Sequence, residues 1–109
     1  MKGEDIIQIK KYFNRERLRI AQRKIKLIAI QHSLILCHYT ISYKTEEAYD
    51  YYATQIYNLE NDEIRINNII KGISVIQKHL KSLHLPPIQR GELRRRMLNN
   101  LLADNQPAN

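Results

Sequence analysis

Residues 45–84 read TEEAYDYYATQIYNLENDEIRINNIIKGISVIQKHLKSLH, and this stretch decides the fold. Side chains recur along it in alternating steps of three and four residues, which is the spacing of one face of an α-helix. We call these positions the seam; they are Tyr49, Tyr52, Ile56, Leu59, Glu63, Ile66, Ile70, Ile73, Gln77 and Leu80. Eight of the ten are apolar or aromatic, and Ile69, Ile76 and Leu83 widen the apolar stripe beside them. The spacing therefore predicts one long helix over residues 45–84.

The chain marks both ends of this helix. Thr45 followed by Glu46 and Glu47 is typical of a helix start, because a threonine oxygen accepts from free amide groups and acids favour the positive end of the helix dipole. Pro86 and Pro87 predict the end, because proline lacks an amide donor and restricts the residue before it.

Residues 5–37 are the candidate partner for this helix, because so long an amphipathic helix needs a second apolar face to bury its own. The same spacing is repeated by Leu18, Ala21, Ile25, Ile28, His32 and Ile35, with Ile6, Ile9 and Phe13 before them. From Ile25 to Cys37 the chain is apolar on nearly every face, which fits a buried helix or a strand; the length and the lack of turn residues favour a helix. The connection is then expected at residues 38–44.

A short third helix is predicted over residues 88–102, where Leu93, Met97 and Leu101 share one face. Residues 103–109 are polar and contain Pro107, so we expect a flexible tail. The predicted fold is all-α: a single domain over residues 1–109, formed by a long antiparallel helical hairpin and a short third helix. Its seam is expected to assemble two chains into a dimeric four-helix bundle.

The composition of the 109 residues excludes several protein classes. Three glycines and three prolines are too few for a many-stranded β-fold, and 43% hydrophobic residues are too many for a disordered chain. We recognise no signal peptide and no apolar run long enough for a membrane span. The single cysteine, Cys37, is expected to pack as a small hydrophobic residue. We expect a cytoplasmic protein with no membrane partner, in a bacterial host cell if the chain comes from a phage.

Two basic groups contribute to the net charge of +7. On the first helix, one arc of about 80° is formed by Arg15, Arg19, Arg23 and Lys26. The second group lies on the third helix and consists of Arg90, Arg94, Arg95 and Arg96. Such side chains can neutralise the phosphates of DNA or RNA, or meet an acidic protein surface. Alternatively they form a solvated face that keeps the chain soluble, and the sequence leaves this choice open.

Six of the seven tyrosines lie between Tyr39 and Tyr57. Tyr51 and Tyr57 fall outside the seam and are candidate anchors for a protein interface or for base stacking. The alternative is that the tyrosines fill the core where the hairpin closes. Within the seam, we expect the Glu63 carboxylate to interact with a basic residue of the first helix, with a second copy of the chain, or with water.

Residues typical of catalysis are scarce. The four histidines, His32, His38, His79 and His84, lack a metal-binding spacing, and one cysteine adds little to them. We recognise neither a glycine-rich phosphate loop nor a nucleophile elbow. We therefore expect no enzyme, no cofactor, no metal and no small-molecule substrate.

Residues 45–98 resemble part of the small phage regulators of the RinA/ArpU type, which activate late genes. The residues that carry the resemblance are Leu59, Glu60, Ile66, Ile69, Ile73, Ile76, Leu80 and Leu83, followed by Glu92-Leu93-Arg94-Arg95-Arg96-Met97-Leu98. In that family a helix-turn-helix similar to the promoter-reading part of sigma factors follows, and this sequence leaves no room for it. The resemblance thus implies a dimerisation or partner-binding region without a sequence-reading head.

The function predicted from these features is a non-enzymatic regulatory or adaptor protein of a phage or mobile element. It would dimerise through the seam and contact nucleic acid, or a nucleic-acid-associated protein, through its arginines. The alternatives are an inhibitor of a host or defence enzyme anchored by the tyrosines, and a structural helical subunit of a larger assembly.

Overall fold

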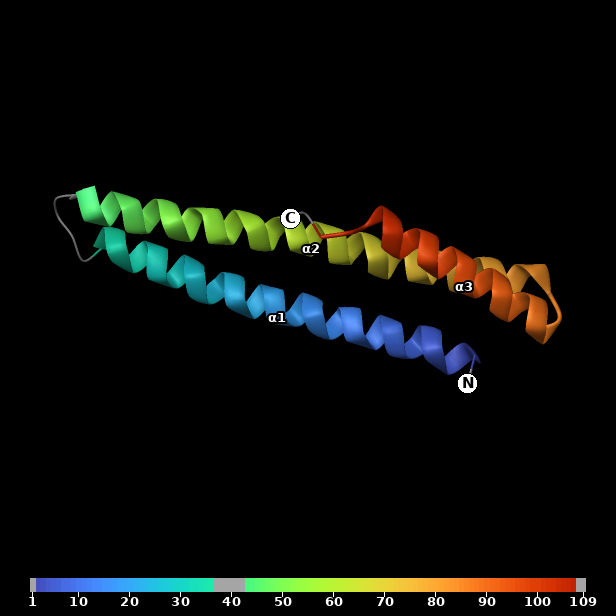
Figure 1. Ribbon diagram of the computed structural model, residues 1–109. Coiled ribbons are helices and arrows are strands. Elements are labelled where there is room, and N and C mark those ends of the chain that lie inside the picture. Colours follow the sequence, from blue (N-terminus) through green and yellow to red (C-terminus); the bar gives the residue numbers. More distant parts are fainter. Residues whose placement is uncertain (1, 37–42, 108–109) are drawn as a thin grey trace. The chain divides into compact units, whose positions relative to one another are not determined.

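The computed structural model describes residues 2–36 and 43–107 and contains three helices (Figure 1). They are α1 (Lys2–Leu36), α2 (Tyr43–Leu83) and α3 (Pro87–Asp104), and the described residues form no strand. The all-α fold, a helical hairpin with a shorter third helix, is confirmed. Residue 1, residues 37–42 and residues 108–109 lie outside the described residues; they include Cys37, His38, Tyr39 and most of the expected connection.

The helix ends differ from those predicted by one to three residues. Helix α2 begins at Tyr43, so Thr45 lies inside its first turn and not at its cap. Its last residue is Leu83, and His84 adopts the left-handed conformation (φ 51°) that commonly follows a helix. Helix α3 begins at Pro87, where a missing amide donor costs nothing because the first helical amides have no partner within the helix.

Helix α3 also runs two residues further than expected, into the predicted tail. The Asn105 side chain explains this extension, since its Nδ2 donates to the Leu101 carbonyl at 2.8 Å. The Asn105 backbone amide donates to the Leu102 carbonyl at 3.3 Å. Carbonyl groups that would otherwise face solvent at the helix end are thus satisfied, and the helix reaches Asp104.

The chain divides into two compact units, and the division falls within both long helices. The first unit combines Met1–Arg17 with Ile64–Asn109, and therefore holds one end of α1, one end of α2 and all of α3. The second unit, Leu18–Glu63, holds the remaining parts of α1 and α2. The chain, which was expected from its length to form a single domain, thus comprises a three-helix unit and a two-helix unit.

The core of the first unit is the second half of the seam. Ile73 is fully buried and Ile69 nearly so, and Ile6 from α1 and Leu98 from α3 join them. The side chains packed around this core are Ile9, Phe13, Leu93, Met97, Leu101 and Leu102. Helices α2 and α3 approach closely at Gly72, where a Cβ atom would lie 2.8 Å from Leu101 Cδ2. The stripe from Ile66 to Leu80 is therefore covered by the chain's own helices.

The second unit buries less, because it contains two helices only. Ile20 and Leu27 of α1 are buried. Opposite them, the seam residues Tyr52, Ile56 and Leu59 of α2 are only half-buried. In a unit of two helices, the apolar face of each helix is covered by one neighbouring helix only, so part of that face stays in contact with water.

Beyond Phe13, the face that α1 packs is not the one predicted from its apolar residues. Its apolar ridge repeats every seven residues and consists of Ile6, Phe13, Ile20, Leu27 and Leu34, all buried or half-buried. In the predicted stripe, Leu18 is 60% exposed, Ile25 is 67% exposed and His32 is exposed. Ala21 and Ile28 are half-buried, and the Ile35 side chain lies outside the described ones. The prediction holds for Ile6, Ile9 and Phe13, which lie in or against the core of the first unit. From Leu18 onward it was wrong, because it placed an apolar residue at every three- or four-residue step along α1.

Between successive residues of the apolar ridge, α1 carries polar residues on the same side of the helix. The side chain of each of them contacts α2. This polar ridge consists of Lys10, Arg17, Lys24 and Gln31. In the first unit, Lys10 Nζ donates to Ser74 Oγ at 3.2 Å, and Arg17 Nη1 makes a long bond of 3.5 Å to Asn67 Oδ1.

In the second unit, Lys24 Nζ lies 3.6 Å from Glu63 Oε1, and Gln31 Nε2 donates to the Tyr49 carbonyl at 3.4 Å. Of the alternatives for Glu63, the basic residue of the first helix is confirmed. Each such contact contributes from a few tenths to about 1 kcal/mol. Together they favour one register, because a slip of α1 by one turn would separate all four pairs.

A matched pair of leucines in α1 tests this register. We expect Leu27→Ala to lower the free energy of unfolding by about 2–3 kcal/mol, since it removes a buried side chain. Leu18→Ala should change it by less than about 0.5 kcal/mol, since Leu18 is exposed. Urea unfolding followed by circular dichroism, at about 1 μM protein, measures both. A larger loss for Leu18→Ala than for Leu27→Ala would contradict the observed face.

Candidate functional site

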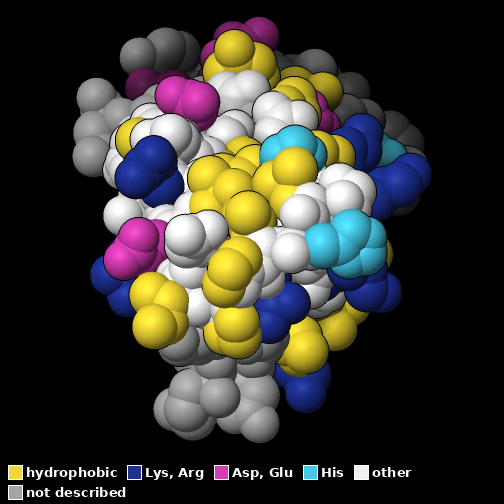
Figure 2. Space-filling model, turned by 90° about the vertical axis from the view of Figure 1, so that its right-hand side faces the viewer, with side chains coloured by type: hydrophobic (Ala, Val, Ile, Leu, Met, Phe, Trp, Pro, Cys, Tyr) yellow, Lys and Arg dark blue, Asp and Glu magenta, His cyan; other side chains and the backbone are white. Residues whose placement is uncertain are grey.

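Positive charge is concentrated in the first unit. Its residues include thirteen Lys and Arg against five Asp and Glu, a net charge of +8. The second unit has five against six, a net charge of −1. Figure 2 looks onto the end of the first unit, where Lys and Arg side chains surround exposed hydrophobic ones. An anionic partner is therefore attracted to the first unit.

The four arginines of α3 do not form one cluster. Because successive residues of a helix are about 100° apart, the run Arg94, Arg95 and Arg96 points in three directions. Arg94 is half-buried and lines two clefts, Arg95 lines one of them, and Arg96 is exposed and lines neither. Arg90, one turn before Arg94, shares the other cleft with it.

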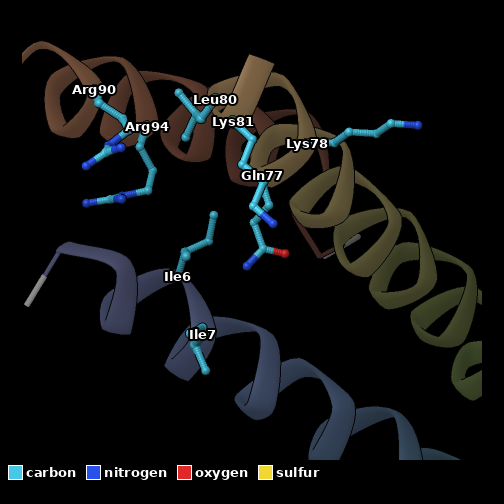
Figure 3. A pocket seen from close by; sticks show the side chains of 8 residues that line it. All are labelled: Ile6, Ile7, Gln77, Lys78, Leu80, Lys81, Arg90 and Arg94. Atoms are coloured by element: carbon cyan, nitrogen blue, oxygen red, sulfur yellow. The ribbon is translucent and has the colours of Figure 1, made fainter. Parts of the chain in front are cut away.

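The larger cleft, which we call the Arg90 cleft, has a volume of about 570 Å³. All three helices of the first unit contribute to it, and its walls are formed by Ile6, Ile7, Gln77, Lys78, Leu80, Lys81, Arg90 and Arg94. Four cations and no carboxylate are among these residues. Figure 3 shows the two guanidinium groups on one side, Gln77 and Lys81 on the other, and Ile6 below them; Lys78 extends away.

The smaller cleft, which we call the Arg95 cleft, has a volume of about 390 Å³. Arg94 and Arg95 lie at its wall with Glu92, so its charge is partly balanced. Its apolar lining comes from Ile9, Ile88, Leu98 and Leu102. The balance of charge makes it the weaker anion site of the two.

The basic arc predicted on α1 is exposed throughout, at Arg15, Arg19, Arg23 and Lys26. Arg15 belongs to the first unit, whereas the other three belong to the second. Their exposure follows from the packing of α1, because the apolar ridge lies on a different side of the helix. All four side chains are therefore in contact with water.

The two candidate aromatic anchors are also exposed. Tyr51 is 60% exposed and Tyr57 is 63% exposed. The Tyr51 ring packs edge-on against Tyr52, with ring centroids 5.3 Å apart and an angle of 79° between the planes. Core filling therefore does not account for Tyr51 and Tyr57, whereas Tyr52 does take part in the hairpin.

The predicted interface is divided between the two units. Its apolar residues in the first unit, namely Ile66, Ile70, Ile73 and Leu80, are buried within the chain. Tyr49 is exposed, and Tyr52, Ile56, Leu59 and Glu63 are half-buried in the second unit. Gln77 lines the Arg90 cleft. The part of the seam that a second copy can reach therefore lies in the second unit.

Over the described ranges, no three His, Cys, Asp or Glu side chains come together as a metal site would require. Within the part of the chain that the structure covers, none of the helices combines the length and hydropathy of a membrane span.

Lys78 and Lys81 are the functional candidates that the sequence analysis missed. Their signal is their place in the last two turns of α2, just before Pro86 and Pro87. Because the prolines end one helix and start the next, the last turns of α2 and the first turns of α3 lie side by side. Lys81 and Arg90 therefore line the same cleft although eight residues lie between them in the sequence.

Comparison with known proteins gives no relative for this chain: no protein family, no curated protein and no solved structure matches it. The function is accordingly inferred from the residues and geometry of the chain itself.

Proposed function

We propose that this chain is a non-enzymatic regulatory or adaptor protein whose first unit contacts the phosphates of nucleic acid. The observation that carries the proposal is the segregation of charge, with +8 on the first unit and −1 on the second. The phage or mobile-element setting rests on the resemblance of residues 45–98 alone.

Exposed arginines on two helices of the first unit suit this contact. Arg15 on α1 and Arg95 and Arg96 on α3 are exposed. A guanidinium group donates two parallel hydrogen bonds to phosphate oxygens and keeps its charge at every physiological pH. Binding of this kind releases counterions from the nucleic acid and is largely independent of base sequence. The chain would thus bring a partner to nucleic acid without reading a specific site.

Two charge-matched double variants test which unit binds. We expect R95Q/R96Q to weaken binding to a labelled duplex and to reduce the slope of log K against log salt by about 1.8, since each lost phosphate contact accounts for about 0.9. R23Q/K26Q removes the same charge from the second unit and should have the smaller effect. Fluorescence anisotropy between about 50 and 200 mM salt measures both slopes.

The controls are helicity and base sequence. Both double variants should keep the far-ultraviolet circular dichroism of the wild type, because the replaced side chains are exposed. A second duplex of unrelated sequence should bind equally well. Equal losses in the two variants would show that only total charge matters, and would contradict the assignment to the first unit.

The second unit is proposed to carry a protein interface, and a homodimer is the partner we favour. Its support is the exposure of Tyr51, Tyr57 and Ile25 beside a half-buried stretch of seam. Tyrosines at such positions commonly anchor interfaces, since they bury a large area at a small cost in side-chain entropy. Two copies would together bury seam residues that one hairpin covers only in part.

Sedimentation equilibrium tests the dimer. We expect wild-type mass to rise towards that of two chains with concentration, and Y51A/Y57A to stay at the mass of one. Tyr12→Ala is the matched control, because Tyr12 is 51% exposed but lies in the first unit. A wild-type chain of single mass at every concentration would refute the dimer. The exposed tyrosines would then favour the second candidate function, an inhibitor that docks on a different protein.

A further inference from the structure

We propose that the Arg90 cleft binds a small organic phosphate, namely a phosphate monoester with an aliphatic body. Arg90 and Arg94 would hold the phosphate head from one side of the cleft and Lys81 would reach it from the other, and the apolar body would lie against Ile7. This inference goes beyond the proposed function, because contact with nucleic acid rests on exposed arginines outside this cleft.

The positive charges that line the cleft favour an anionic ligand. Arg90 and Arg94 reach it from α3, and Lys81 reaches it from α2 (Figure 3). No side-chain nitrogen of these three residues is hydrogen-bonded or ion-paired within the described chain. Three like charges around one cleft repel one another, and Arg94 is half-buried, where water screens that repulsion less. A dianion between them would turn the repulsion into attraction.

The arrangement of donors favours phosphate over carboxylate. Two guanidinium groups one helical turn apart can offer paired donors to different oxygens of a tetrahedral head, and Lys81 adds a third direction. The Gln77 amide on the same side as Lys81 supplies a further donor (Figure 3). A carboxylate, with two oxygens in one plane and a single charge, would leave donors and charge unsatisfied.

The floor of the cleft favours an ester over a free phosphate ion. Ile7 is 46% exposed and lines the cleft together with the buried Ile6 and Leu80. A ligand body covering Ile7 removes apolar surface from water and gains affinity from the hydrophobic effect, which a bare ion cannot. None of the lining residues is aromatic, so a nucleobase would find no stacking partner and an aliphatic body fits better.

The size of the cleft fits a small molecule. Its volume of about 570 Å³ lies in the range of pockets that hold small ligands, about 300–1,000 Å³. Such a ligand is either a soluble phosphate ester or the head of a phospholipid with part of its chain. The shared chemistry is a phosphate on an aliphatic body, and we favour the soluble ester.

Titration calorimetry with a series of alkyl phosphates tests the proposal. Inorganic phosphate, methyl, butyl and hexyl phosphate carry the same head on bodies of increasing length. We expect saturable binding that strengthens about threefold to fourfold for each methylene group buried, the factor that corresponds to about 0.8 kcal/mol. R90Q/R94Q should lose at least tenfold in affinity for hexyl phosphate. R96Q, on the same helix but outside the cleft, should bind as the wild type does.

Three results would overturn the proposal. Absence of hexyl phosphate binding removes the ligand, equal binding of inorganic and hexyl phosphate removes the apolar body, and an equal loss in R96Q reduces the effect to general charge. R90Q alone keeps the test valid if the double variant does not fold, because Arg90 is exposed.

Vesicles distinguish the two sources of the ligand. Sedimentation with phosphatidic acid in phosphatidylcholine vesicles should show no loss in R90Q/R94Q if the ligand is a soluble ester. A loss specific to that variant would assign the cleft to the phospholipid head. Duplex binding by R90Q/R94Q, measured separately, keeps this result distinct from the nucleic-acid proposal.

Discussion

The burial of one stripe of α2, from Ile66 to Leu80, is the constraint on which the rest of the structure depends. Because α1 and α3 both cover it, the first unit has a closed core centred on Ile73. The turn at Pro86 and Pro87 that brings α3 onto this stripe also brings Arg90 and Arg94 into the same cleft as Lys81. The same packing that stabilises the unit thus creates the more cationic of the two clefts described above. Residues 18–63 form a two-helix unit, and their apolar side chains are covered less completely.

The polar ridge of α1 explains how the hairpin holds its register with so few apolar contacts. Lys10, Arg17, Lys24 and Gln31 take positions that a more stable hairpin would fill with isoleucine or leucine. Their pairs with α2, such as Lys24 with Glu63, give up some hydrophobic stabilisation and specify a single alignment. This alignment also leaves the basic arc of α1 exposed. The register of the hairpin and the exposure of its basic arc therefore both follow from the alternation of apolar and polar ridges along α1.

The sequence predicts α2 and α3 well because their apolar residues are dense and two prolines mark the break between them. It mispredicts the packed face of α1, because Leu18 and Ile25 look like core residues while Lys10 and Lys24 do not. Only the positions of Ser74 and Glu63 on the other helix reveal that lysines belong there. The Arg90 cleft was not predictable either, since it needs three helices at once. The exposure of Tyr51 and Tyr57, by contrast, follows from the spacing of α2 alone.

Amide hydrogen exchange along α2 tests the central claim, that a closed three-helix core around Ile66–Leu80 stabilises the chain. It should be measured at a concentration at which sedimentation shows single chains. We predict that the amides of residues 66–80 exchange only through global unfolding. Those of residues 46–60 should exchange at least tenfold faster, which corresponds to about 1.4 kcal/mol of local stability. Equal protection along the whole helix, or stronger protection of residues 46–60, would contradict the account.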